Sequence, residues 1–348
     1  MNDQNILVGL LLISSGAFTS GSFAIPFGKI KSWQWETYWL IFSFGAYILF
    51  PLAACLIFSP EFIKILGLVP SETLLLVFVL GAVYGIGNLS FGLSLRYLGI
   101  SLGYALSLGL MLAIGTLIPP LIDGRLRVMM ETSGGYLLLA GVLTAVAGIA
   151  FTGTAGFLKD KSITDDKKKE TVSEFNYLKG VIAALLVGIT GSAMSLGFEQ
   201  GIPIAEIARQ QGTNALFITM PVMLVLLSGT FVTTVVWCIY LGIRNKSLGN
   251  YVRGVSDGSL QGNYLFSILA GLLWFSQFIL FGMGKSKMGP FTFTSWGILM
   301  GLTIVFATLW GLYRKEWKGA SRRIIILMLI SLLIIIASSY LIGISGSV

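Results

Sequence analysis

Long apolar stretches separated by short polar segments run through the whole chain, and this pattern predicts helices that cross a membrane. A crossing helix needs about 20 mostly apolar residues, because the hydrocarbon core is about 30 Å thick and a helix rises about 1.5 Å per residue. Ten stretches reach that length, at 6–27, 37–58, 73–96, 99–122, 134–157, 179–200, 216–243, 262–284, 289–312 and 323–345. We therefore expect an all-α polytopic membrane protein with ten transmembrane helices.

Composition strengthens this expectation and argues against an enzyme. Only 11% of the 348 residues are charged, whereas about 25% is typical of soluble domains. The chain has no histidine, the commonest general base and metal ligand. Cys55 and Cys238 both lie in apolar stretches, where thiols behave as small hydrophobic groups. We expect no catalytic site, no metal site and no cofactor.

The basic residues indicate an orientation in the membrane. Of the 23 lysines and arginines, 17 lie in the loops that join helices 1–2, 3–4, 5–6, 7–8 and 9–10, and 6 lie on the opposite side. Cytoplasmic loops carry the excess of basic residues, so both termini should be outside. We read the first apolar stretch as a retained helix, because Asp3 and no basic residue precedes it. The net charge of +8 then reflects topology, and the expected partner is the lipid bilayer rather than nucleic acid.

A polar segment near the middle divides the chain into two sets of five predicted helices. Residues 158–178 form a predicted cytoplasmic linker between a first repeat, 1–157, and a second repeat, 179–348. Five identical or aromatic positions recur at a constant offset of 190 residues, pairing Gly81, Tyr84, Phe91, Gly92 and Gly99 with Gly271, Trp274, Phe281, Gly282 and Gly289. An odd number of helices per repeat gives the two repeats opposite orientations, as in many secondary transporters.

Polar side chains within predicted helices 3 and 8 are candidates for substrate contacts. Asn88 follows Tyr84 by one helical turn, and Gln277 follows Trp274 similarly. Polar groups at membrane depth are costly unless they are paired or face a cavity. An amide offers two donors and an acceptor, and an aromatic face packs well against the C–H surface of a sugar ring. The four residues suit a small neutral polyol, and the alternative is hydrogen bonding between helices.

Three charged residues near helix ends are candidates for proton coupling or gating. Glu36 begins helix 2, and Arg96 closes helix 3 on the same predicted cytoplasmic side. They could form an ion pair that serves as an inner gate or responds to protons, with a static clamp as the alternative. Glu199 lies near the outer end of helix 6, where an ordinary interfacial carboxylate is the other interpretation.

Several sequence blocks carry a resemblance to a known family. They are Pro26–Lys29 with Trp33–Thr37, the segment YGIGNLSFGLSLRYLGISLG at 84–103, Gly115–Leu117, Trp274 with Gln277-Phe278, and Lys315–Trp317 ahead of Arg322-Arg323. With these blocks the chain resembles the L-rhamnose–proton symporter family of the drug/metabolite transporter superfamily. The resemblance extends from helix 1 to helix 10.

The resemblance implies ten helices and import of L-rhamnose or a related methylpentose by proton symport across the bacterial inner membrane. The substrate would be a sugar and the coupling ion H⁺, with transport by alternating access between the two repeats. One alternative is a drug/metabolite-type carrier or exporter of another small metabolite. A second is a membrane-embedded transferase, which would need an intramembrane nucleophile or a loop with histidine or clustered carboxylates, and the sequence has neither. The sequence does not indicate an oligomeric state.

Overall fold

The computed structural model describes residues 6–122, 131–162, 172, 174–252, 259–288 and 295–345. Across these ranges every regular element is a helix, which confirms the all-α class. The chain divides into two compact units that are described separately. Unit 1 contains Met1–Gly21, Gly87–Ser192 and Met283–Val348, and unit 2 contains Ser22–Ile86 and Ala193–Gly282.

The helices follow the apolar stretches of the sequence. They are α1 (Ile6–Ser22), η1 (Pro26–Lys29), α2 (Trp35–Phe44), η2 (Gly45–Leu49), α3 (Phe50–Phe58), α4 (Phe62–Leu68), α5 (Ser71–Leu98), α6 (Ile100–Ile122), α8 (Ser133–Ser162), α10 (Tyr177–Gln200), α11 (Ile202–Gln210), α12 (Met220–Arg244), η3 (Leu248–Tyr251), α13 (Leu260–Lys287), α14 (Ser295–Tyr313) and α15 (Arg322–Ser345). Among the described residues, eight helical segments are long and apolar enough to cross a membrane, and two shorter apolar helices, Ile100–Ile114 and Ile298–Tyr313, fall in the predicted fourth and ninth stretches. The protein is therefore a multi-pass membrane protein.

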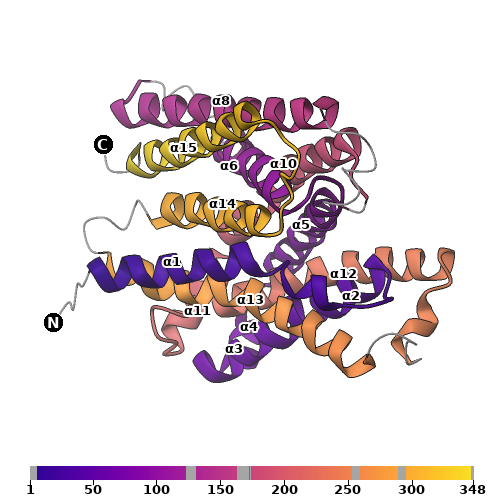
Figure 1. Ribbon diagram of the computed structural model, residues 1–348. Helices are drawn as coiled ribbons and strands as arrows, with labels where there is room; N and C mark the ends of the chain where they lie inside the picture. The colour runs from indigo at the N-terminus through magenta and orange to yellow at the C-terminus, as the bar shows by residue number, and fades with distance from the viewer. Residues whose placement is uncertain are drawn as a thin grey trace. The chain divides into compact units, whose positions relative to one another are not determined.

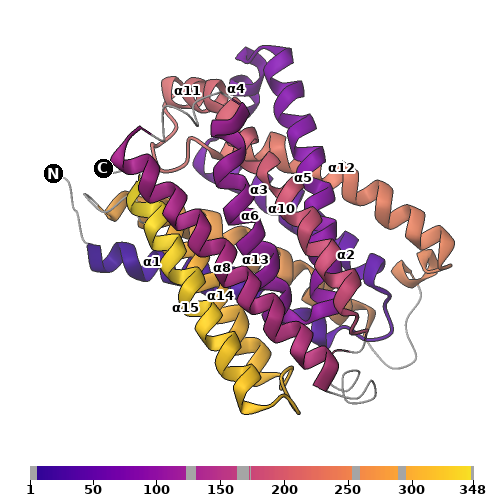
Figure 2. The same cartoon turned by 90° about the horizontal axis from the view of Figure 1, so that it is seen from above.

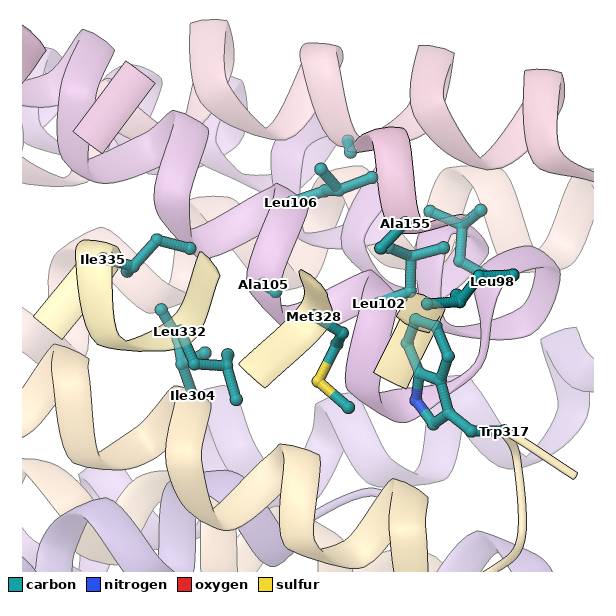
Figure 3. Packing of buried hydrophobic residues seen from close by; sticks show 12 residues of the cluster. Leu98, Leu102, Ala105, Leu106, Ala155, Ile304, Trp317, Met328, Leu332 and Ile335 are labelled. Atoms are coloured by element: carbon teal, nitrogen blue, oxygen red, sulfur yellow. The ribbon is translucent and has the colours of Figure 1, made fainter. Parts of the chain in front are cut away.

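Unit 1 has a core to which helices from distant parts of the sequence contribute. Figure 3 shows its buried side chains, which include Leu98, Leu102, Ala105, Leu106, Ala155, Ile304, Trp317, Met328, Leu332 and Ile335. Helices α8 and α15 lie side by side in both views (Figures 1 and 2). Small residues permit this approach, since a Cβ on Gly148 would lie 2.7 Å from Cγ1 of Ile335.

Unit 2 contains a close crossing of α5 and α12. Each helix has a glycine at the contact: a Cβ on Gly81 would overlap the carbonyl oxygen of Leu226, and a Cβ on Gly229 would overlap that of Phe78. The Thr230 hydroxyl donates a hydrogen bond to the Gly81 carbonyl at 2.9 Å. The two backbones therefore touch directly, with no side chain between them.

The second apolar stretch is interrupted by a wider turn that the sequence pattern did not predict. Helices α2 and α3 are joined by the π-helical turn η2, in which the N–H of Phe50 donates to the carbonyl of Gly45, five residues earlier. Pro51 supplies a physical reason. A proline has no N–H for the carbonyl four residues earlier, here that of Tyr47, and its ring crowds that carbonyl.

Contacts near helix ends in unit 2 join segments that are far apart in the sequence. The Asn263 side chain, at the start of α13, accepts from the Lys31 N–H at 3.1 Å and donates to the Lys31 carbonyl at 2.9 Å. The loops that carry α4 and α11 also meet, where the hydroxyls of Ser59 and Thr213 are 2.8 Å apart. The short helices α4 and α11 contact each other and were not predicted.

Neither compact unit corresponds to one half of the chain. Each unit takes helices from both predicted repeats, and the boundary between units runs through α5, α10 and α13 and before the last residue of α1. Residues 158–162 of the predicted linker are the last residues of α8, while 163–171 and 173 lie outside the described residues. The two inverted repeats are inferred from the sequence alone, and they stay a prediction.

Candidate functional site

The candidate sugar-binding residues of α13 lie on a helix that approaches α2 and η2 closely. A Cβ on Gly271 would lie 2.8 Å from the backbone nitrogen of Ala46 and 2.9 Å from the carbonyl oxygen of Phe42. Trp274 lies one helical turn further along, on the same face. Its ring centroid is 5.2 Å from that of Tyr47, at an interplanar angle of 79°. Helix α13 therefore presents Trp274 directly to the π-helical turn.

Buried aromatic side chains surround Trp274 in unit 2. Its ring is 5.2 Å from that of Phe278, and the Tyr47 ring is 5.8 Å from that of Phe42. Tyr84, on α5, is close enough to Tyr47 for the two phenol groups to interact electrostatically. The exposed fractions are 0% for Tyr47, 5% for Trp274 and 7% for Tyr84. Sequence reasoning missed Tyr47, because only the π-helical turn distinguishes it from other aromatic residues in apolar stretches.

The two candidate amides are buried, and each is described in its own unit. Gln277 in unit 2 is 5% exposed, and its Nε2 donates to the carbonyl of Trp274 at 2.7 Å. This bond uses one of the two N–H groups of the amide. Asn88 is 4% exposed and lies in the part of α5 that belongs to unit 1. The structure thus groups Tyr84, Trp274 and Gln277 in unit 2.

Glu36 is buried in the first turn of α2, with neutral groups as its hydrogen-bond donors. It is 2% exposed, and its Oε1 accepts from Asn245 Nδ2 at 2.9 Å and from Ser247 Oγ at 2.7 Å. Both donors belong to the turn that ends α12. There Lys246 has a φ of 56°, and the Ser247 N–H donates back to the Gly242 carbonyl at 2.9 Å. This reversal of the chain aims Ser247 at the carboxylate.

Aromatic side chains cover the same end of unit 2. The Trp33 ring is 6.2 Å from that of Tyr251 and 5.1 Å from that of Tyr264. Burial raises the pKa of Tyr251 well above its usual value, and the nearby Cys238 thiol and Glu36 carboxylate act in the same direction. The phenol of Tyr251 therefore stays neutral beside the carboxylate at physiological pH.

The other two candidate coupling or gating residues lie in more exposed settings. In unit 1, Arg96 pairs with Glu174: its Nη2 lies 2.7 Å from Oε2, and its Nε donates to the same oxygen at 2.8 Å. The sequence predicted an ion pair between Arg96 and Glu36. The hydrogen-bond partners described for Arg96 lie in unit 1, and those described for Glu36 lie in unit 2. Glu199, near the end of α10, is exposed. The proposed roles of these residues stay predictions.

Comparison with known proteins supplies an identity for the chain. A family model described as L-rhamnose-proton symport protein matches residues 1–347. The chain belongs to the L-rhamnose-proton symport family. The L-rhamnose-proton symporters of Yersinia pestis (strain Pestoides F) and Yersinia pseudotuberculosis (strain YPIII) are each 33% identical to it over 343 residues, which cover 97% of this chain and 97% of the relative. No solved structure matches the chain. Membership in a symporter family makes the chain a transporter and removes the transferase alternative.

One sequence block that resembles the symport family, Lys315–Trp317, contains a second buried carboxylate. Glu316 is 5% exposed, and its two oxygens accept from the backbone N–H groups of Ile100 at 2.9 Å and Ser101 at 3.0 Å. The carboxylate thus caps the N-terminus of α6, where backbone N–H groups lack partners within the helix. Gly99, with a φ of 83°, makes the turn into α6. Burial raises the pKa of Glu316, although both backbone hydrogen bonds oppose the shift.

A buried lysine joins the same cluster from the end of α8. Lys159 is 2% exposed, and its Nζ donates to the Glu316 carbonyl at 2.5 Å. The ammonium also lies 5.0 Å from the ring centroid of Trp317 and 5.2 Å from that of Phe175, within the range of cation–π attraction. The cluster ties three segments of unit 1 together. The sequence offered one signal for this cluster, because Lys159 comes just after the predicted apolar helix 134–157.

Glu316→Ala should lower the thermal stability of this symport-family protein. The change leaves two backbone N–H groups at the start of α6 without their acceptor, a loss of about 1–3 kcal/mol. The melting temperature of purified protein in detergent measures the effect. Glu174→Ala is the matched control, because its partly exposed ion pair contributes about 1 kcal/mol or less. Equal melting temperatures for the two variants would contradict the capping role.

Proposed function

We propose that the chain imports L-rhamnose or a closely related methylpentose together with protons, by alternating access. The observation that carries this proposal is the match to the L-rhamnose-proton symport family over residues 1–347. The relatives named L-rhamnose-proton symporter support it, because their similarity covers 97% of both chains. We further propose ten crossings in two inverted repeats, with both termini outside, in the inner membrane of a bacterium. The basic asymmetry of the loops supports this orientation.

The proposed sugar site uses Tyr84, Asn88, Trp274 and Gln277. Aromatic faces would contact the C–H surface of the sugar, and amides would exchange hydrogen bonds with its hydroxyls. The burial of all four side chains supports the assignment, because binding sites for neutral polar solutes in a membrane protein are shielded from lipid.

The proposed proton carrier is Glu36, with Glu199 as the other candidate carboxylate and Arg96 as a candidate coupling or gating residue. Its burial and its two neutral donors support the choice. When a carboxylate paired with a buried cation is neutralised, the cation is left buried without its partner, which is costly. An amide and a hydroxyl carry no charge, so a neutral Glu36 would leave neither of these two partners as an unpaired buried cation.

Uptake of labelled L-rhamnose into proteoliposomes tests the proposed function. With an inward proton gradient, sugar should accumulate above its outside concentration, and collapse of the gradient with a protonophore should abolish accumulation. Accumulation that is unaffected by the protonophore would overturn proton symport. Failure to transport L-rhamnose, combined with transport of another metabolite, would reassign the substrate and favour a different carrier of the same superfamily.

Gln277→Ala and Asn88→Ala should each raise the KM for L-rhamnose by about ten-fold, as expected for loss of one or two hydrogen bonds to the sugar. Gln261→Ala is the matched control, because Gln261 lies on the same helix as Gln277 and is exposed. Initial rates of uptake at varied sugar concentration give the KM values. A KM equal to that of the control would remove the residue concerned from the site.

A further inference from the structure

The π-helical turn η2 lies inside the membrane-spanning segment Trp35–Phe58. Such turns are rare and occur frequently at functional sites. A local reason lies next to it: Pro51 cannot donate to the carbonyl of Tyr47, and the N–H of Phe50 donates to Gly45, five residues earlier, rather than to Ala46. A wider turn rotates the residues within it relative to a regular α-helix. The direction in which Tyr47 points therefore depends on this turn.

The turn lies at the closest approach of α13. A Cβ on Gly45 would lie 3.3 Å from Cδ1 of Ile268, and a Cβ on Gly271 would lie 3.2 Å from the carbonyl carbon of Gly45. Two helices in backbone contact cannot adjust their spacing to suit a displaced side chain. The direction of Tyr47 thus determines where its ring meets α13, and the ring it meets is that of Trp274.

Trp274 is held by groups of unit 2 on both its backbone and its ring. Its carbonyl accepts from Gln277, and its ring makes edge contacts with Phe278 on its own helix and with Tyr47 from the π-helical turn. Of these, Tyr47 is the contact that comes from another element.

We propose that Tyr47 is a positioning residue of the sugar site, and that the π-helical turn sets its register against Trp274. The inference rests on the proposed function, in which Trp274 contacts the sugar. Fixing the plane of the indole before the sugar arrives reduces the ordering cost of binding. The role belongs to the Tyr47 ring and does not need its hydroxyl.

Substitutions of Tyr47 separate this role from a general structural one. Tyr47→Leu removes the ring and should raise the KM for L-rhamnose by up to about ten-fold, the upper end of what one aromatic pair contributes, with little change in kcat. Tyr47→Phe keeps the ring and should restore the KM to within about two-fold of the original. An unchanged KM in Tyr47→Leu would overturn the proposal, and so would a Tyr47→Phe variant as impaired as Tyr47→Leu.

Substitution of Pro51 tests the part played by the turn while leaving Tyr47 in place. Pro51→Ala restores the missing N–H, allows a regular α-helix, and should raise the KM as Tyr47→Leu does. Pro203→Ala is the matched control, because Pro203 lies in the first turn of α11 as Pro51 does in the first turn of α3, but no π-helical turn precedes it. An unchanged KM in Pro51→Ala would overturn the register claim. If Tyr47→Leu does not fold, Pro51→Ala and Tyr47→Phe still decide the outcome.

Trp274→Leu distinguishes failure of this inference from failure of the proposed site. If Trp274→Leu leaves the KM unchanged, then the proposed sugar site is wrong. If Trp274→Leu raises the KM while Tyr47→Leu and Pro51→Ala do not, then the site stands and the positioning role of Tyr47 is wrong.

Discussion

Glu36→Gln should abolish proton-driven accumulation of L-rhamnose while sugar exchange across the membrane continues. Glutamine keeps an oxygen that can accept from Asn245 and Ser247, so the contact between α2 and the end of α12 is preserved. It cannot gain or lose a proton, so the driving force of the gradient is no longer transmitted. The measurement is uptake into proteoliposomes with an imposed proton gradient, compared with exchange of labelled for unlabelled sugar without one.

Glu72→Gln is the matched control for this experiment. Glu72 lies in the first turn of α5, as Glu36 does in the first turn of α2, but its side chain is exposed. The Glu72→Gln variant should accumulate L-rhamnose as the unmodified protein does. Retained accumulation in Glu36→Gln would show that the proton is carried elsewhere, and Glu199→Gln would then be the next variant to measure.

Gly81→Ala should strongly destabilise the protein. The new Cβ would overlap the carbonyl oxygen of Leu226, and the crossing cannot widen without weakening the bond from Thr230 to the Gly81 carbonyl. Overpacking of this kind costs about 1–3 kcal/mol, and more where backbone has to move. The melting temperature in detergent and the yield of monodisperse protein should both fall.

Gly67→Ala provides the comparison. Gly67 is also helical and in unit 2, but a Cβ there would meet nothing within 4 Å. Because alanine favours the helix over glycine by about 1 kcal/mol, this variant should be as stable as the unmodified protein or slightly more so. A similar loss of stability in both variants would mean that glycine flexibility, and not the close crossing, matters at Gly81.

The positions of the long helices could be predicted from the sequence because each one needs a continuous apolar stretch of membrane length. The described helices begin and end near the predicted boundaries, although α1 ends at Ser22 and α8 continues to Ser162. The short helices α4 and α11 and the turn η2 were missed. Each of these elements depends on only a few residues, such as the single Pro51. So few residues leave the average hydrophobicity of an apolar stretch unchanged.

The candidate site was predictable only in part. Polar and aromatic residues inside apolar stretches stand out, which is why Tyr84, Asn88, Trp274 and Gln277 could be chosen as candidates from the sequence. The partners of Glu36 were not, because Asn245 and Ser247 lie 209 and 211 residues away in the sequence and sit in a loop where polar residues are ordinary. Pairings over such distances depend on how helices pack, and hydrophobic periodicity carries no information about them.

Unit 1 is built from helices that are far apart in the sequence, and this has a consequence for how the protein is made. Helix α1 is synthesised before α14 and α15, yet its Phe18 ring packs 5.4 Å from that of Phe306 on α14, and the unit's core includes Met328 and Leu332 of α15. Synthesis of the intervening chain takes on the order of tens of seconds. During that time lipid or the insertion machinery must cover the faces of α1 that later meet protein. The core of unit 1 can therefore be completed only after α15 has entered the membrane.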